Sequence, residues 1–221
     1  MAPALDCSPG DRSPTLVSGV VLAGGLSRRF GRDKARALLL GRPMIEYPLQ
    51  ALSERTSICV VVGGRPWWPD GEPPRARIIA DLYPGRGPLG ALVTALRTIS
   101  TPWCLFVACD MPLVEPPVLD LLIERARTSS HDAIAFRVHG RPQPFVAAYS
   151  RRCLPVLERR LAEGELKMVD SFPELRVDFL APADLEEVGG TSWSFFNVNT
   201  PKAAYTAEQH LKGRAGDESR G

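Results

Sequence analysis

The residues best suited to chemistry follow the first apolar run of the chain. The run Val17–Ala23 ends at Gly24-Gly25, and basic residues come next: Arg28, Arg29, Arg32 and Lys34. Two glycines at the end of a buried strand can present backbone N–H groups to a ligand. The basic side chains indicate that this ligand is an anion, and a phosphate chain fits best. The alternative interpretation is a glycine turn followed by solvated arginines.

The spacing in this stretch excludes two common phosphate-binding motifs. Five residues separate Gly25 from Gly31, and no Lys-Ser or Lys-Thr pair follows them, so the stretch is not a Walker-type loop. It does not have the dinucleotide-binding spacing G-x-G-x-x-G either. The stretch therefore predicts a phosphate site of another type, built from a backbone turn and basic side chains.

Carboxylates and amides follow later apolar runs. Asp81 follows the strand pattern at 77–80, and Asp110 directly follows Trp103–Cys109, the most apolar run of the chain. Asn197 and Asn199 stand near the end of the last strand candidate. A carboxylate held at the tip of a buried strand supplies the hard oxygen ligand that Mg²⁺ prefers. Structural alternatives exist for all four: a helix N-cap for Asp110, a turn for Asp81, and turn or cap chemistry for the asparagines.

These residues need a scaffold that brings strand ends together. Apolar runs alternate with helical patterns, and strands are expected at 17–23, 57–62, 77–81, 103–109, 132–138, 144–149, 176–180 and 194–199. Helices are expected after Pro43, Pro88, Pro112, Ser150 and Thr200, with Pro48 bending or shortening the first of them. The alternation predicts an α/β fold with a Rossmann-like, doubly wound, mostly parallel sheet. Ligands bind at the carboxyl ends of such strands, so the candidate residues should converge on one edge.

The composition is that of one soluble globular domain. The chain has 221 residues, 44% hydrophobic and 24% charged, and we expect a single domain over 16–211 between disordered segments at 1–15 and 212–221. A net charge of +2 argues against a nucleic-acid or membrane partner. No run of 18 apolar residues and no secretory signal are present, so we expect a cytoplasmic protein. The five cysteines form no C-x-x-C pair, which argues against a zinc site or a disulfide framework.

Four segments together resemble the motifs of the molybdenum cofactor guanylyltransferase family: 22–34, 81–90, 109–112 and 196–201. The resemblance extends over about residues 18–211. It implies a fold of the nucleotide-diphospho-sugar transferase type. It also implies a nucleotidyltransferase that transfers GMP from GTP to molybdenum-bearing molybdopterin, forms molybdopterin guanine dinucleotide and releases pyrophosphate.

The resemblance also implies roles for individual residues. Backbone groups of the first motif would hold the guanine nucleotide, namely those of Leu22, Ala23, Gly24 and Gly25. Arg28 and Lys34 would contact the triphosphate, and Asp81 would contact the nucleotide. Asp110 would bind Mg²⁺ and touch the nucleotide, and Asn197 and Asn199 would line the molybdopterin side. One feature departs from the family: Gly63-Gly64-Arg65 occupies a region where members often carry a nucleotide-contacting asparagine.

The implied reaction needs no general base. The terminal phosphate of molybdopterin, with a second pKa of about 6, is largely ionised near neutral pH and can attack the α-phosphorus directly. Arg28, Lys34 and Mg²⁺ would then stabilise the developing negative charge. Two alternatives stay open: a related transferase that uses CTP or another phosphorylated acceptor, and a non-catalytic nucleotide-binding regulator. Transient contact with molybdopterin-delivering or molybdoenzyme chaperone proteins is also expected.

Overall fold

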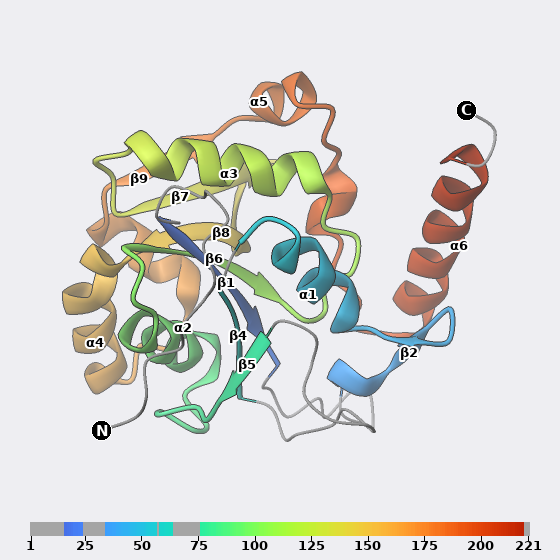
Figure 1. The fold of residues 1–221 in the computed structure, drawn as a ribbon. Helices are drawn as coiled ribbons and strands as arrows, with labels where there is room; N and C mark the ends of the chain where they lie inside the picture. Colours follow the sequence, from blue (N-terminus) through green and yellow to red (C-terminus); the bar gives the residue numbers. More distant parts are fainter. Residues whose placement is uncertain (1–15, 24–33, 57, 64–75, 219–221) are drawn as a thin grey trace, which may run out of the picture.

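The computed structural model describes residues 16–23, 34–56, 58–63 and 76–218. At its centre is a seven-stranded sheet with strand order β5-β4-β1-β6-β8-β7-β9 (Figure 1). Its strands are β1 Val17–Leu22, β4 Cys59–Val62, β5 Ala76–Ile79, β6 Trp103–Ala108, β7 Ala133–Val138, β8 Arg141–Ser150 and β9 Val177–Leu180. Among these strands only β8 runs antiparallel to its neighbours. The predicted α/β fold with a mostly parallel sheet is therefore confirmed.

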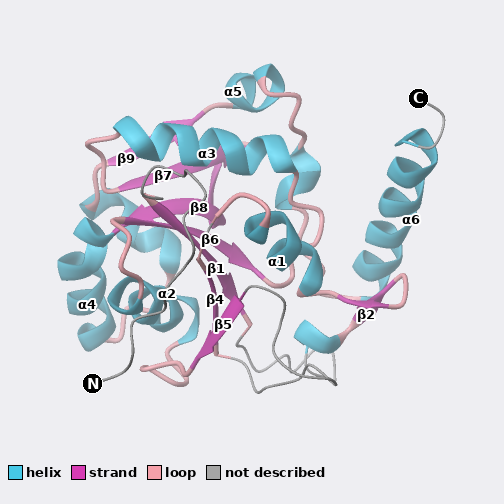
Figure 2. Cartoon of the chain, viewed as in Figure 1, coloured by secondary structure: helices cyan, strands magenta, loops and turns pink. Residues whose placement is uncertain are grey.

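Helices cover both faces of the sheet. On one face lie α1 Glu46–Ser53, α3 Pro116–Thr128 and α5 Pro182–Glu187, and on the other lie α2 Gly87–Thr98 and α4 Leu154–Glu163 (Figures 1 and 2). Successive strand residues such as Leu105 and Phe106 enter opposite core clusters. Both faces are thus buried, which explains why the central strands read as continuous apolar runs.

A third cluster lies outside these layers. The short hairpin of β2 Leu38–Leu39 and β3 Arg42–Pro43 packs against α6 Pro201–Glu218, which stands to one side of the sheet (Figure 1). The buried members of this cluster are Leu39, Met44, Leu113, Val198 and Ala207. The cluster joins the chain's C-terminal helix to the segment just before it and to the loop after β6.

The first helix differs from its prediction. Pro43 lies in β3, and α1 begins three residues further on, at Glu46. Pro48 consequently falls in the first turn of α1, where a missing N–H breaks no helical hydrogen bond. It neither bends nor interrupts the helix.

The C-terminal part also differs from its prediction. Residues 194–199 form no strand: a 3₁₀ turn, η4 Ser192–Phe195, leads into a loop. Helix α6 begins at Pro201 as expected, with Thr200 Oγ1 accepting a hydrogen bond from the Ala203 N–H at 3.1 Å. It continues past Leu211 to Glu218, through the start of the segment predicted as a disordered tail. The helix is capped by Thr200 and packed on the hairpin, and beyond Leu211 its Arg214 faces Glu115. Segment 1–15 lies outside the described residues.

Cysteines of the described residues lie in the core. Cys59 and Cys104 are buried thiols, and burial raises the pKa of Cys59 to about 12 and that of Cys104 as well. Within the described residues, no group of three or more His, Cys, Asp or Glu side chains is arranged to hold a metal ion. The helices of that part of the chain are too short or too polar to span a bilayer.

Asp132 joins β7 to β9 at the edge of the sheet. Its Oδ2 accepts hydrogen bonds from the backbone N–H and Nε of Arg176, at 3.1 and 3.2 Å, and its Oδ1 accepts one from Arg176 Nη2 at 2.8 Å. The bonded Arg176 guanidinium lowers the pKa of the Asp132 carboxyl to about 2. This contact is therefore a pH-dependent contribution to stability.

Asp132→Asn should lower the free energy of unfolding by about 1 kcal/mol at pH 7, a figure that allows for solvent screening of Arg176. The folded pKa lies below the value of about 3.9 for an exposed aspartate. The contribution is thus complete above that value and disappears as the pH falls toward 2. Urea unfolding at a series of pH values should show the two proteins converging in acid, whereas the exposed control Asp170→Asn should track the parent throughout. Equal stability of parent and Asp132→Asn at pH 7 would contradict the assignment.

Candidate active site

Asp110 stands just beyond the carboxyl end of β6. Backbone hydrogen bonds hold the chain on both sides of it: Cys109 N–H donates to the Leu22 carbonyl at 3.0 Å, and Met111 N–H donates to the Ala108 carbonyl at 3.1 Å. The end of β6 is thus fixed to the end of β1. The Asp110 side chain is only 14% exposed, and its Oδ1 is buried with no hydrogen-bond partner in the described part of the chain. A buried carboxylate oxygen without a partner indicates that a donor or a cation belongs beside it.

Lys34 supplies the positive charge beside this carboxylate. It begins the 3₁₀ turn η1 Lys34–Arg36, and its Nζ donates a hydrogen bond to Asp110 Oδ2 at 2.6 Å. The same Nζ donates to Asn199 Oδ1. Three predicted site residues from distant parts of the sequence therefore meet at one ammonium group. The side chain of Lys34 is 15% exposed, so its charge lies in a partly desolvated site where electrostatic interactions are strong.

The segment 197–199 is held against Asp110 by its backbone. Val198 N–H donates to the Asp110 carbonyl at 2.9 Å, and the Val198 side chain is fully buried in the third cluster. Asn197 Oδ1 is a second buried oxygen with no partner within the described residues. The strand that was expected to place both amides on one side is absent. A buried valine between them nevertheless anchors the segment beside Asp110.

Asp81 has the turn role that the sequence left open. Its Oδ1 accepts hydrogen bonds from Tyr83 N–H at 2.9 Å and from Thr94 Oγ1 at 3.0 Å. These bonds close the turn before α2, and none of the hydrogen bonds described for Asp81 reaches Lys34 or Asp110. A nucleotide contact by Asp81 stays a prediction, and Oδ2 is the atom that would make it, since Oδ1 is engaged.

The sheet already uses some backbone groups of the first motif. The Leu22 carbonyl accepts the hydrogen bond from Cys109, and Ala23 N–H donates to the Val62 carbonyl at 3.0 Å. If Leu22 and Ala23 contact the nucleotide as predicted, they should do so through backbone groups other than the Leu22 carbonyl and the Ala23 N–H. Several residues singled out from the sequence lie outside the described residues: Gly24, Gly25, Arg28, Arg29, Gly31, Arg32, Gly64 and Arg65.

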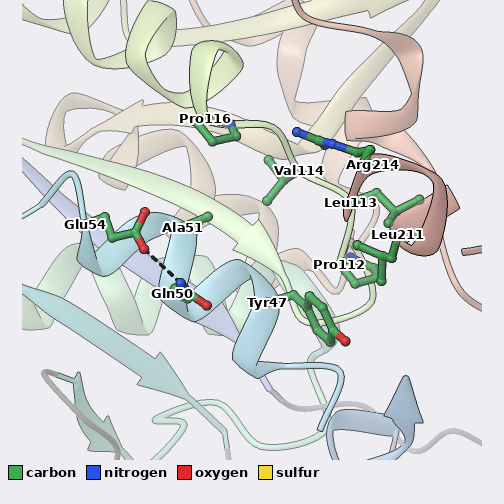
Figure 3. A pocket seen from close by; sticks show the side chains of 10 residues that line it. All are labelled: Tyr47, Gln50, Ala51, Glu54, Pro112, Leu113, Val114, Pro116, Leu211 and Arg214. Carbon is green, nitrogen blue, oxygen red and sulfur yellow. Dashed lines mark hydrogen bonds between the residues drawn. The ribbon is translucent and has the colours of Figure 1, made fainter. Parts of the chain in front are cut away.

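A groove of about 180 Å³ lies next to this cluster but does not include it (Figure 3). It is formed by Tyr47 and Gln50 of α1, the loop 112–116, and Leu211 and Arg214 of α6. None of its lining residues is Lys34, Asp110 or Asn199. The chemistry of the site therefore lies at the ends of β1 and β6 and not in this groove.

Taken together, the cluster suits a phosphorylated ligand accompanied by a divalent cation. Lys34 can neutralise phosphate charge, and the unpartnered Asp110 Oδ1 is an oxygen ligand for a hard cation. Mg²⁺ binds through one or two carboxylates and completes its coordination with phosphate oxygens and water.

Comparison with known proteins finds similar chains. The MobA-like NTP transferase domain matches residues 19–176. A protein of Bacillus licheniformis named "probable molybdenum cofactor guanylyltransferase" is 36% identical over 184 residues, which cover 81% of this chain and 90% of that protein. A protein of Pelotomaculum thermopropionicum with the same name is 34% identical over 202 residues, which cover 89% and 96% of the two chains.

A solved structure is similar over nearly its whole length. The crystal structure of molybdopterin-guanine dinucleotide biosynthesis protein A from Archaeoglobus fulgidus has a TM-score of 0.77 and 29% identity. The match covers 89% of this chain and 99% of that one.

Proposed function

The chain belongs to the MobA-like NTP transferase family, and we propose that it transfers GMP from GTP to molybdenum-bearing molybdopterin. The products are molybdopterin guanine dinucleotide and pyrophosphate. The observation that supports this most directly is the cluster of Lys34, Asp110 and Asn199 at the strand ends, joined by the hydrogen bonds of one ammonium group.

In this reaction an oxygen of the molybdopterin phosphate attacks the α-phosphorus of GTP. The new O–P bond forms as the bond from the α-phosphorus to the bridging oxygen breaks, and pyrophosphate leaves with that oxygen. Both the attacking and the leaving groups are anionic, so the protein has to position them and neutralise their charge. No proton has to be removed from the attacking phosphate, because that group is already ionised near neutral pH.

Asp110 fits a magnesium ion. Its carboxylate has one oxygen on Lys34 and one buried oxygen with no partner among the described residues, which matches a ligand that contributes one bond to the ion. Bound Mg²⁺ would act as a Lewis acid that draws negative charge from the phosphate oxygens. Asp110 would hold that ion, with Asp81 and the first-motif backbone holding the nucleotide.

Lys34 would neutralise the triphosphate. Its ammonium group pairs with Asp110, so the buried carboxylate is not left as an uncompensated charge. Its flexible four-carbon side chain allows the same group to turn to the phosphates when they arrive. Arg28, in the first motif, would add a second positive charge. Asn197 and Asn199 would face the acceptor, and Val198 between them donates its N–H to the Asp110 carbonyl, which keeps both close to the metal ligand.

Product formation from defined substrates tests this function. The purified chain with Mg²⁺, GTP and molybdopterin should release pyrophosphate and yield a product with the mass of molybdopterin guanine dinucleotide. Calorimetry with GTP, CTP and ATP should rank GTP first, and Mg²⁺ plus GTP should raise the melting temperature. Tighter binding of CTP would favour the cytidylyl alternative, and nucleotide binding without pyrophosphate release would favour a regulator. Delivery of molybdopterin by a protein partner, and a cytoplasmic location, stay predictions.

A further inference from the structure

Glu115 is a buried carboxylate that the proposed reaction does not use. It directly precedes α3 and is 7% exposed. Its Oε2 accepts three hydrogen bonds: from Thr191 N–H at 2.7 Å, Thr191 Oγ1 at 2.9 Å and Ser194 Oγ at 2.8 Å. Arg214 Nη1 lies 3.6 Å from its Oε1. Because several donors surround this buried charge, the Glu115 carboxylate is fixed in place. It therefore also fixes the 3₁₀ turn η4, which supplies those donors.

The backbone of Glu115 strengthens this connection. Glu115 N–H donates to Ser194 Oγ at 3.0 Å, so the Ser194 hydroxyl both accepts from the backbone of Glu115 and donates to its side chain. Thr191, the residue that caps η4, also accepts a hydrogen bond from Trp193 N–H at 3.3 Å. The first turn of η4 is therefore built around one carboxylate.

Two segments consequently run side by side with a tie at each end. One segment is the loop 110–115, which begins at the candidate metal ligand, and the other is 191–199, which carries Asn197 and Asn199. Glu115 ties the far ends together through Thr191 and Ser194. The Asp110 carbonyl ties the near ends by accepting from Val198 N–H at 2.9 Å. The distance between Asp110 and the two asparagines depends on both ties.

Helix α6 reinforces the far tie. The rings of His210 and Trp193 stack with centroids 4.3 Å apart, and Arg214 of the same helix faces Glu115. Figure 3 shows Arg214 reaching from α6 toward the loop 112–116, at Val114 and Pro116. The start of η4 and helix α6, both far from Glu115 in the sequence, thus converge on its carboxylate.

We propose that Glu115 is a positioning residue for the acceptor substrate. It holds Asn197 and Asn199 at a fixed place relative to Asp110 and touches neither GTP nor the acceptor. This inference rests on the proposed function, in which those asparagines line the molybdopterin side. Among the elements assigned to the nucleotide, β1 and the turn before α2 are held by other contacts, and Lys34 of η1 keeps its hydrogen bond to Asp110 if Asn199 moves. A defect at Glu115 should therefore fall mainly on the acceptor half.

Glu115→Gln tests the proposal. Glutamine keeps the size of the side chain, but the hydrogen bonds to its oxygen are no longer assisted by a negative charge, and its amide N–H groups would face a guanidinium that also only donates. The KM for molybdopterin should rise about tenfold, while the Kd for MgGTP measured by calorimetry should stay within about twofold. Thr191→Val, which removes one donor and leaves the charge in place, should show a smaller shift of the same kind, and it serves if Glu115→Gln does not fold.

Glu174→Gln is the matched control, because Glu174 also accepts a hydrogen bond from a buried arginine, Arg160 Nη1 at 2.6 Å, but in another part of the fold. This variant should lose stability, but it should not raise the KM for molybdopterin relative to the Kd for MgGTP. Equal weakening of GTP and molybdopterin in Glu115→Gln, or no change in either, would overturn the positioning role.

Hydrogen exchange provides a readout that needs no acceptor. The amides of Val198 and Asn199 should exchange faster in Glu115→Gln than in the parent, and at the parental rate in Glu174→Gln. Unchanged exchange in Glu115→Gln would overturn the positioning role even if the parent enzyme proved active. Conversely, the exchange in Glu115→Gln could be faster while the parent makes no dinucleotide product. That result would reject the proposed function but would still show that Glu115 holds the segment 191–199 in place.

Discussion

Replacing Lys34 by alanine is expected to lower kcat about 100- to 1,000-fold and to raise the KM for GTP only a few fold. The reason is that negative charge builds up on the leaving pyrophosphate as the bond to the α-phosphorus breaks. A preorganised donor aimed at developing charge typically contributes a factor of this size, because it acts mainly in the transition state. Steady-state kinetics with GTP varied at saturating molybdopterin give both constants.

The structure makes this experiment cleaner than it would be for an exposed lysine. Lys34 is fixed by two hydrogen bonds, to Asp110 and to Asn199, so its charge occupies a defined place before substrate arrives. Lys167→Ala is a suitable control, since Lys167 is a solvent-exposed lysine in another part of the fold and should leave kcat within about twofold. A variant of Lys34 that raised only KM would show that the lysine docks the nucleotide and does not assist the transfer.

The fold was largely predictable because its strands are buried on both faces. The run Trp103–Cys109 is apolar throughout, and Val17–Ala23 is interrupted only by Ser18 and Gly19. Each forms a strand whose bounds lie within one residue of the run. Proline marked the first turn of α2 and α6. His139 and Gly140 both have positive φ in the turn that joins β7 to the antiparallel β8. The strands of the sheet could therefore be predicted from short local stretches of the sequence.

The segment 194–199 could not be predicted in the same way. Its aromatic and β-branched residues resemble a strand, but the ring of Trp193 packs on Phe196 and His210, and Val198 enters the third cluster. Tertiary packing thus overrides β propensity at this place. The partners that decide the outcome belong to α6 and to the loop after β6, and no local pattern indicates them.

The candidate site was predictable in its members but not in its contacts. Lys34, Asp110 and Asn199 each lie in a motif that the sequence shows. Their contact, however, joins Lys34 to one residue 76 positions away and to another 165 positions away in the sequence. Glu115 gave no signal at all, since a glutamate between a valine and two prolines reads as an ordinary loop residue. Its importance comes from burial and from three donors on a remote turn, which only the structure supplies.

Asp110→Asn is expected to lower kcat about 1,000-fold or more and to abolish the rise in melting temperature that Mg²⁺ adds to that of GTP. Asparagine has nearly the shape of aspartate, and its amide oxygen can still accept the hydrogen bond from Lys34. What it loses is the negative charge, and with it the hard anionic ligand that Mg²⁺ requires. The fold should survive, because the backbone hydrogen bonds of Cys109, Met111 and Val198 hold this loop independently of the side chain.

Melting curves with GTP alone, Mg²⁺ alone and both together separate the metal from the nucleotide. In the parent, Mg²⁺ and GTP together should stabilise more than the sum of each alone, since Asp110 would hold the ion and the phosphates of GTP would supply further oxygen ligands to it. In Asp110→Asn that excess should vanish while stabilisation by GTP alone persists. Asp170→Asn, which alters an exposed carboxylate, should keep the excess in full. An Asp110→Asn protein that retained both the excess and its kcat would place the metal elsewhere, because the unpartnered Oδ1 of Asp110 would then have no part in holding it.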